Sequence, residues 1–320
     1  PIRAASTILE EIHRCGGNGA ACHAQMYIMG SLLRHGSEKL KKKYLPSIAD
    51  GSLRLQAFGV TEPTSGSDTL SIKTSAKKKG DRFVINGQKV WTSRAEYSDL
   101  ILLLARSENC KIKKNNLSLF LIDMRPYLEK NIFIKPIKTM INHSSTEIFF
   151  EDLEIDEECL IGKLGNGFEY ILDGMNAERI LIASECIGDA KYFIDKAKNY
   201  ANQRIVFGRP IGKNQSIQFP IAKAYAHTKA AELMVMQACS LYDSDLKCGE
   251  ESNLAKLLAA DASWESADAA MQTFGGFSFA EEYNIERKFR ETRLYRIAPV
   301  STNMILAYLS HKILGMPRSY

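Results

Sequence analysis

The stretch Phe-Gly-Val-Thr-Glu-Pro-Thr-Ser-Gly-Ser-Asp, residues 58–68, is the most specific segment of this chain. Its apolar beginning followed by Thr, Ser, Gly and Pro indicates a strand that runs into a polar loop. Further along, Asn86-Gly87 separates two strand-like runs, 82–85 and 88–91. Asn-Gly between such runs predicts a two-residue hairpin turn, because both turn positions need positive φ.

Three blocks surround these segments. Residues 1–56 have apolar positions at three- and four-residue steps and predict helices, the last beginning near Ser37 and ending by Gly51. Residues 57–156 predict an antiparallel β domain, with further strands at 101–105, 117–124, 132–136 and 146–150. Residues 157–320 predict an antiparallel helical bundle, with helices at 167–201, 216–247 and 252–273 and a last helix after Ser301. We therefore predict an α+β multidomain protein.

The composition excludes several classes of protein. A hydrophobic fraction of 45%, a charged fraction of 25% and a net charge of +5 are ordinary for a globular protein. The lysines at 39–43 and 77–79 are interpreted as solvated faces, so no nucleic-acid partner is expected. No apolar run reaches the ~18 residues that would span a membrane.

The cysteines and histidines give no metal site. Seven scattered cysteines favour a reducing compartment over a disulfide framework. His13, Cys15, Cys22 and His23 do not have the spacing of zinc ligands. No GxGxxG segment follows a strand, so a dinucleotide would not be bound in the Rossmann manner. The chain begins without Met, directly in helical patterning, which suggests a start inside a larger protein whose targeting region is missing.

Several motifs together resemble the acyl-CoA dehydrogenase family, in order and spacing, over essentially the whole chain. They are residues 58–68, Asn86 to Lys89 with Trp91-Thr92-Ser93, Leu160-Ile161-Gly162 with Gly165 to Phe168, Arg204 with Phe207-Gly208, Gln272 with Gly275-Gly276, and 295–305. The resemblance implies the fold of that family: an N-terminal helical domain (partial here, 1–56), a central β domain (57–156) and a C-terminal four-helix bundle (157–320).

The resemblance also implies the cofactor, FAD, and the residues that contact it in the β domain. These are Phe58, Val60, Thr61, Gly66, Ser67, Trp91, Thr92 and Ser93. Trp91 would shield the flavin ring, although burial in a strand core is the alternative interpretation. Ser93 stands where the family has a Thr that donates to flavin N5, and it keeps the hydroxyl.

Further FAD contacts are implied in the bundle. They are Arg204, Phe207, Asn214, Gln215, Gln272, Gly275, Gly276, Ser301 and Asn303. Arg204 would pair with the pyrophosphate, because a planar guanidinium matches phosphate oxygens. In the family several of these residues reach an FAD held mainly by a neighbouring subunit, so a homo-oligomer (dimer or tetramer) is expected.

The reaction that the resemblance implies needs a base for the proton α to the thioester, and a carboxylate in a dry pocket is suitable. Many members carry this Glu in the C-terminal segment, where this chain has Pro299. A minority, similar to isovaleryl- and long-chain-type enzymes, carry it on the first bundle helix, where this chain has Glu178. Apolar neighbours one turn away predict a buried Glu178 rather than a solvated one. Glu185, two turns on, is the rival base.

Substrate contacts are expected from Ser67, Met175, Arg179 and Val300. Family members polarise the thioester oxygen with a backbone N–H near Pro299, which has none. Either Val300 supplies this N–H, or the register differs by one, or activity is weaker.

The expected function is therefore α,β-dehydrogenation of an acyl-CoA to the trans-2-enoyl-CoA, with an electron-transfer flavoprotein as the acceptor. The alternatives are an oxygen-reactive oxidase or monooxygenase on the same fold, or a non-catalytic flavin- or CoA-binding relative. The expected location is the cytoplasm in a bacterium or the mitochondrial matrix in a eukaryote.

Overall fold

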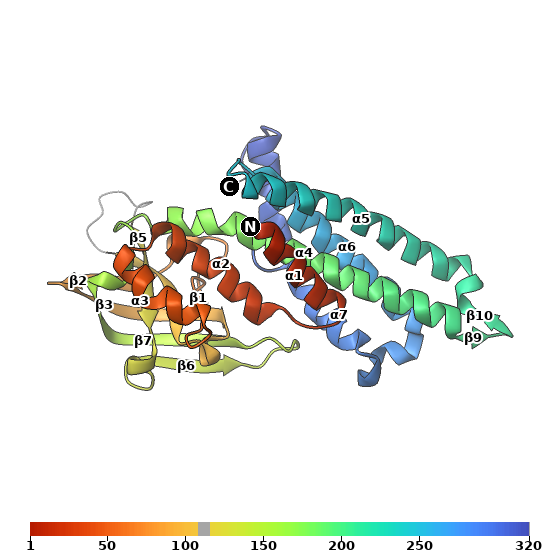
Figure 1. Ribbon diagram of the computed structural model, residues 1–320, viewed down its shortest axis with the longest axis horizontal. Helices are drawn as coiled ribbons and strands as arrows, with labels where there is room; N and C mark the ends of the chain where they lie inside the picture. The colour runs from red at the N-terminus through yellow and green to blue at the C-terminus, as the bar shows by residue number, and fades with distance from the viewer. Residues whose placement is uncertain (108–115, 320) are drawn as a thin grey trace. The chain divides into compact units, whose positions relative to one another are not determined.

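The computed structural model describes residues 1–107 and 116–319 (Figure 1). Contacts between residues divide the chain into two compact units, 20–175 and 1–19 with 176–320. Each unit is described by itself below. The helix α4 (Gly167–Gln203) continues from the first unit into the second.

The unit 20–175 contains the predicted β domain. Among its described residues an eight-stranded sheet has the order β6-β7-β3-β2-β4-β5-β8, with β1 beside β4. β1 and β2 run parallel to β4, and the other pairs are antiparallel. The strands are β1 (Leu55–Gly59), β2 (Ser75–Lys79), β3 (Arg82–Ser93), β4 (Leu100–Ser107), β5 (Leu117–Asp123), β6 (Ile132–Ile137), β7 (Ser145–Asp156) and β8 (Leu160–Ile161).

The predicted hairpin turn at Asn86-Gly87 is wrong. These residues lie inside the continuous strand β3, at a register shift against β7, and the turn before β3 is formed by Gly80-Asp81 instead. Gly87 has φ 152°, and a Cβ there would lie 2.5 Å from the Thr74 hydroxyl oxygen. Asn86-Gly87 therefore lies at a β-bulge, where the missing side chain of Gly87 lets the backbone of Thr74 approach closely.

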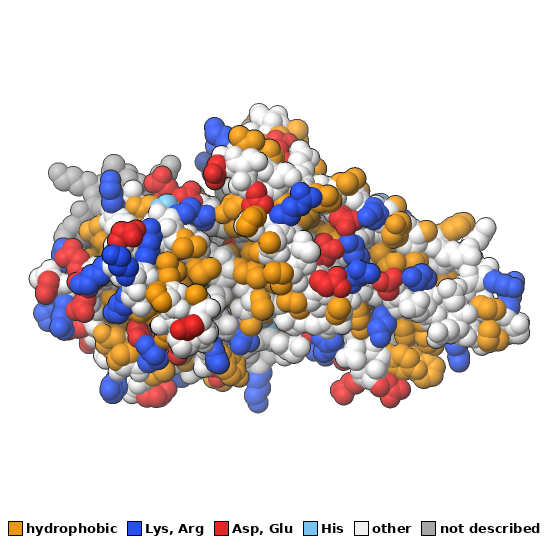
Figure 2. All heavy atoms as spheres, in the orientation of Figure 1, with side chains coloured by type: hydrophobic (Ala, Val, Ile, Leu, Met, Phe, Trp, Pro, Cys, Tyr) orange, Lys and Arg blue, Asp and Glu red, His pale blue; other side chains and the backbone are white. Residues whose placement is uncertain are grey.

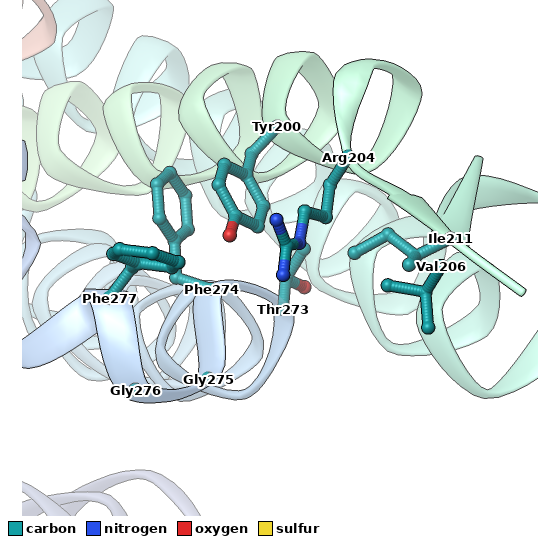
Figure 3. Close-up of a pocket in the computed structure, with 9 residues that line it drawn as sticks. All are labelled: Tyr200, Arg204, Val206, Ile211, Thr273, Phe274, Gly275, Gly276 and Phe277. Carbon is teal, nitrogen blue, oxygen red and sulfur yellow. The ribbon is translucent and has the colours of Figure 1, made fainter.

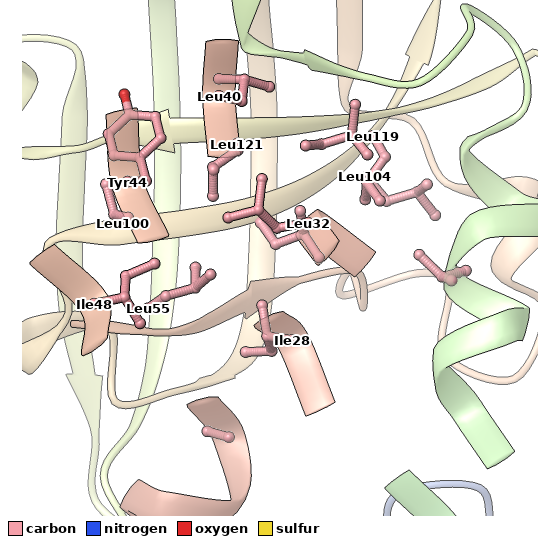
Figure 4. Close-up of a cluster of buried hydrophobic side chains, with 14 of the residues drawn as sticks. Ile28, Leu32, Leu40, Tyr44, Ile48, Leu55, Leu100, Leu104, Leu119 and Leu121 are labelled. Carbon is pink, nitrogen blue, oxygen red and sulfur yellow. The ribbon is translucent and has the colours of Figure 1, made fainter. Parts of the chain in front are cut away.

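Two helices cover one face of this sheet, α2 (Ala20–His35) and α3 (Glu38–Ala49). The Ser37 hydroxyl accepts a hydrogen bond from Leu40 N and caps α3, as predicted. Figure 4 shows Ile28, Leu32 and other side chains of these helices facing leucines of β4 and β5. Burial of these side chains, worth about 1.5–3 kcal/mol each, holds the helices on the sheet.

The second unit is the predicted helical bundle, in which Figure 1 shows α4, α5 and α6 running alongside one another. Its helices besides α4 are α1 (Ile2–Arg14), α5 (Gln215–Asp243), α6 (Gly249–Phe274), α7 (Ile285–Arg293) and α8 (Thr302–Tyr308). Buried alanines recur along α6, among them Ala259, Ala267 and Ala270, so neighbouring helices can approach closely. The α+β fold and the long helices predicted from the sequence are confirmed.

A buried ionic cluster joins α1 to α4 and α7. Lys288 pairs with Asp189 and, at 3.1 Å, with Glu291. The Gly19 N–H donates to His13 Nε2 at 2.9 Å, so Nδ1 carries the proton and donates to Asp189 at 2.8 Å. Burial raises the pKa of Asp189, but Lys288 and His13 more than offset this and hold it below its usual range. The cluster fixes the first helix to the bundle.

The lysine runs lie at the surface with acidic neighbours, as in the pairs of Lys78 with Glu157 and Lys79 with Glu154. On the face shown in Figure 2, basic and acidic side chains are interspersed rather than gathered by sign. Within residues 1–107 and 116–319 no helix has the length and apolarity to cross a membrane, and no cluster of three His, Cys, Asp or Glu side chains could hold a metal ion.

Candidate functional site

A buried ion pair organises the loop that contains the 58–68 motif. The Glu62 carboxylate accepts from Lys73 N at 2.6 Å, Thr74 N at 2.8 Å and Lys89 Nζ at 2.9 Å. Lys89 Nζ also donates to the Val60 carbonyl at 2.9 Å. The pair therefore ties the start of the loop to β3 and to the chain before β2.

Burial and the charge of the partner shift the pKa values of both Glu62 and Lys89. Burial raises the pKa of Glu62, but Lys89 and the two backbone N–H groups outweigh it, so the net shift is downward. Burial lowers the pKa of Lys89 to about 8, and Glu62 offsets only part of that effect. Both side chains are buried, so neither can replace its partner with water. Our sequence analysis did not identify this pair, although both residues lie inside the quoted motifs.

The motif residues predicted to contact FAD remain accessible around this pair. Phe58, Val60 and Thr61 are partly exposed, and Gly66 and Ser67 are exposed. The Val90 N–H donates to the Thr61 carbonyl at 2.9 Å, which joins the loop to β3. The loop thus presents backbone and hydroxyl groups from a fixed base.

The end of β3 carries the second predicted group, Trp91 to Ser93. Trp91 has φ 60° and its side chain is 59% exposed, so the interpretation as strand core is wrong. A positive φ in a bulky aromatic residue is rare, and such outliers concentrate at functional sites. The Thr92 hydroxyl is buried and has no hydrogen-bond partner among the described residues. Ser93 Oγ lies 2.7 Å from His143 Nε2, which our sequence analysis missed.

A polar cavity of about 470 Å³ lies beside this strand end. Residues that follow Ser93 line it on one side, including Arg94 and Tyr97, and the segment from Ile141 to Ser145 lines it on the other. The Arg94 guanidinium lies 5.2 Å from the centre of the Tyr97 ring, and its Nε donates to Gln56 at 2.8 Å. No motif indicated this cavity, because it forms only when β3 and β7 pair.

In the bundle unit, Glu178 lies on α4 and is 7% exposed, which confirms the predicted burial and excludes a solvated Glu. Its neighbour Arg179 donates to Asn176 Oδ1 at 3.1 Å, and Arg179 Nε is buried without a partner among the described residues. Burial lowers the pKa of the Arg179 guanidinium, and Glu178 offsets part of this. The Arg179 side chain thus keeps an unused hydrogen-bond donor next to the buried Glu178 carboxylate in the sequence.

The rival carboxylate, Glu185, has a different environment. It is 2% exposed and lies 3.9 Å from His13 Nε2, at the edge of the ionic cluster with Asp189 and Lys288. This supports the interpretation of Glu185 as a structural group.

The C-terminal segment places Pro299 and Val300 in a loop between α7 and α8. Val300 has φ 61°, and Ser301 caps α8, accepting from Met304 N at 3.4 Å. Asn303 is exposed in the first turn of α8. Lys256 on α6 donates to the carbonyls of Tyr295 and, at 2.9 Å, Val300. Our sequence analysis did not identify Lys256, which looks like any lysine on a helix.

A second cavity in the bundle unit, of about 500 Å³, brings together three of the residues predicted to bind FAD (Figure 3). Arg204 lies at the end of α4, opposite Gly275 and Gly276 at the end of α6. The Arg204 guanidinium lies 5.8 Å from the centre of the Phe277 ring. The walls are completed by stacked Tyr200 and Phe274 rings, whose centres are 4.1 Å apart.

This cavity fits a phosphate-bearing cofactor. Gly275 has φ 59°, and a Cβ on Gly275 or Gly276 would meet no atom within 4 Å, so backbone is open to a ligand there. Arg204 supplies the planar cation that phosphate oxygens prefer.

The other predicted FAD residues of the bundle are not in the cavity wall. Phe207 is 100% exposed at the turn between β9 (Ile205–Val206) and β10 (Arg209–Pro210). Asn214 precedes α5 and accepts from Arg209 at 2.8 Å, while Gln215 and Gln272 are exposed. A fully exposed Phe at a hairpin tip is costly in water and suits contact with another molecule.

Comparison with known proteins agrees with these features. The N-terminal, middle and C-terminal domain models of acyl-CoA dehydrogenases match residues 2–52, 57–153 and 165–310. The chain is 32% identical to an acyl-CoA dehydrogenase of Mycobacterium tuberculosis, over 98% of this chain and 81% of that protein. It is 34% identical to cyclohex-1-ene-1-carbonyl-CoA dehydrogenase of Syntrophus aciditrophicus, over 97% and 75%. The structure of a glutaryl-CoA dehydrogenase with glutaryl-CoA matches with a TM-score of 0.91 at 29% identity, over 99% and 80%. The chain therefore belongs to the acyl-CoA dehydrogenase family, enzymes whose cofactor is FAD.

Proposed function

We propose that the protein oxidises an acyl-CoA thioester to the trans-2-enoyl-CoA, with Glu178 as the base. The observation that carries this proposal is the buried Glu178 carboxylate, in a chain whose C-terminal segment has Pro299 instead of a carboxylate. Glu178 Oε takes the proton from the carbon α to the thioester. Bound FAD supplies the hydride acceptor for the β carbon.

Four other residues are proposed to bind and orient the acyl-CoA. The expected contacts Ser67, Met175, Arg179 and Val300 position the acyl-CoA, and Arg179 Nε has no partner among the residues that the structure describes. Burial of Glu178 keeps the abstracted proton from exchanging freely with solvent. These groups therefore act by orientation and by exclusion of water.

The FAD contacts proposed in the β domain are Phe58, Val60, Thr61, Gly66, Ser67, Trp91, Thr92 and Ser93. The Glu62–Lys89 pair holds the loop that carries the first part of this set. The Thr92 hydroxyl, buried and without a partner among the described residues, is a polar group that a ligand can satisfy. The contacts proposed in the bundle are Arg204, Phe207, Asn214, Gln215, Gln272, Gly275, Gly276, Ser301 and Asn303.

The proposed assembly is a homo-oligomer, in which the exposed Phe207 contacts a neighbouring subunit. The proposed electron acceptor is an electron-transfer flavoprotein, and the proposed location is the cytoplasm of a bacterium or the mitochondrial matrix of a eukaryote.

Replacing Arg204 with Ala is expected to weaken FAD binding by about 10- to 100-fold, since a charge-assisted hydrogen bond to phosphate is lost. Release of FAD on dilution, followed by its fluorescence, measures the effect. Lys198→Ala is the matched control, because Lys198 is an exposed cation near the end of α4, one to two turns before Arg204, and pairs with Asp195 at 3.1 Å. Equal loss of FAD in both variants would show that Arg204 acts only through net charge.

Product analysis tests the reaction class. The protein with FAD bound is incubated with acyl-CoA in air, with and without an electron-transfer flavoprotein, and the enoyl-CoA and hydrogen peroxide formed are quantified. We expect stoichiometric enoyl-CoA and turnover only with the acceptor. Peroxide formed in step with the enoyl-CoA would indicate an oxidase, and a hydroxylated product a monooxygenase.

A further inference from the structure

Lys256 is a buried cation that the reaction outlined above does not use. Its side chain is 0% exposed, and within the described part of the chain its Nζ bonds only to the carbonyls of Tyr295 and Val300. No carboxylate among those residues forms an ion pair with it. A buried ammonium compensated by carbonyl groups alone is costly. Burial accordingly lowers the pKa of Lys256.

The two carbonyls flank the segment that contains Pro299. A second link from α6 joins the same segment, since Arg296 Nε lies 3.0 Å from Asp261 Oδ1. The Ile297 and Ala298 N–H groups donate to the Leu294 carbonyl at 2.8 and 3.0 Å. α6 therefore holds the loop through Lys256 and Asp261, and the backbone bonds to Leu294 make the loop compact.

Val300 is the residue that needs this support. Its φ of 61° lies in the left-handed region, which β-branched residues rarely adopt and which strains the backbone. Its N–H makes no hydrogen bond with any described residue, whereas its carbonyl accepts from Lys256. Holding the carbonyl while φ stays near 61° restricts the directions that the N–H on the other side of Cα can take.

We infer that Lys256 is a positioning residue that aims the Val300 N–H at the thioester oxygen of the acyl-CoA, where Pro299 has no N–H to offer. This inference rests on the proposed dehydrogenation. The Val300 N–H donates to the thioester oxygen as the α proton passes to Glu178, so the negative charge that develops on this oxygen is stabilised by a fixed donor.

A pair of ligands that differ only in the thioester oxygen tests the inference. One is the trans-2-enoyl-CoA of the chain length that the enzyme oxidises best, which keeps the carbonyl and is not oxidised further. The other is the S-alkyl-CoA thioether of the same carbon skeleton, which lacks the carbonyl. The ratio of their dissociation constants, from calorimetric titration of the FAD-bound protein, reports the hydrogen bond to the oxygen.

Lys256→Met keeps the volume of the side chain and removes its donors. We expect the preference for the thioester to fall by about tenfold, the value of one well-placed hydrogen bond, while thioether binding changes little. Lys256→Arg, which keeps the charge and donors, should recover part of the preference. If the Met variant does not fold, Lys256→Gln replaces it, with a loss of at least about threefold expected because the amide still donates but is shorter and uncharged.

The matched control is Lys288→Met, which removes another fully buried lysine of the same unit, one that pairs with Asp189 and Glu291. It should lower the melting temperature without changing the thioester preference. Suppose that acyl-CoA reduces the flavin of the wild type, but Lys256→Met keeps the thioester preference within twofold of the wild-type value. This result would overturn the role of Lys256 and leave the proposed function standing. A wild type that no acyl-CoA reduces would overturn the proposed function and this inference with it.

Discussion

Glu178→Gln is expected to lower the rate of flavin reduction by acyl-CoA by roughly 10³-fold or more, at the upper end of what a positioned base contributes. Gln has nearly the same shape as Glu, so the acyl-CoA should still bind. It cannot take the α proton, because an amide is not a base at neutral pH. Anaerobic stopped-flow absorbance of the flavin measures the rate, and titration with the enoyl-CoA product checks that binding persists.

Glu185→Gln is the matched control for this prediction. Glu185 is also buried on α4 but lies beside His13 and the ionic cluster. We expect flavin reduction within about tenfold of the wild type, with some loss of thermal stability from the altered cluster. If Glu178→Gln were reduced at the normal rate and Glu185→Gln were not, the base would be Glu185.

Lys89→Met has the second large effect, on stability rather than on chemistry. It leaves the buried Glu62 carboxylate without its cation, and breaking a buried pair in this way costs about 3–5 kcal/mol. It also frees the Val60 carbonyl, so the 58–68 loop should loosen and FAD should bind more weakly. Urea unfolding of the FAD-free protein, followed by circular dichroism, measures the free energy of unfolding.

Two further variants separate the pair from general damage. Lys89→Met combined with Glu62→Gln should recover part of the loss, because no buried charge remains unpaired. Arg125→Met removes an exposed cation that bonds Asp123 at 2.7 and 2.9 Å, and should cost less than about 1 kcal/mol. If Arg125→Met and Lys89→Met lowered the free energy of unfolding equally, the large effect could not be attributed to the burial of the Glu62–Lys89 pair.

The same pair predicts a pH dependence. The pKa of Lys89 is about 8 in the folded protein, below the usual 10.5, so between these values the unfolded chain holds a proton that the folded chain has released. Unfolding then takes up a proton, and stability rises with pH. The free energy of unfolding of the wild type relative to Lys89→Met should therefore increase from about pH 8 to 10.5. A constant difference would show that Lys89 titrates normally.

The sequence predicted the order of the domains and the burial of Glu178, because both depend on local periodicity. Apolar residues one turn from Glu178 on each side identify its helix face without any tertiary contact. The hairpin predicted at Asn86-Gly87 was wrong because the same dipeptide also occurs at a bulge inside a long strand. Only the pairing of β3 with β7 distinguishes a hairpin turn from a bulge.

The supporting residues could not be predicted. Glu62 and Lys89 lie far apart in sequence and meet only through the register of the sheet. Lys256 has alanine and leucine neighbours on α6 like any amphipathic lysine, and its partners are backbone carbonyls, which carry no sequence signal. Ser93 was identified through its motif, whereas its partner His143 lies across the β3–β7 pairing.

Anaerobic titration of the full-length protein, with FAD bound, against acyl-CoAs of graded length and branching tests the central claim most directly. We predict that at least one acyl-CoA bleaches the flavin absorbance to completion, and that the same acyl-CoA leaves the Glu178→Gln variant oxidised over the same time. A flavin that stays oxidised with every acyl-CoA, or a Glu178→Gln variant that bleaches as the wild type does, would contradict the account.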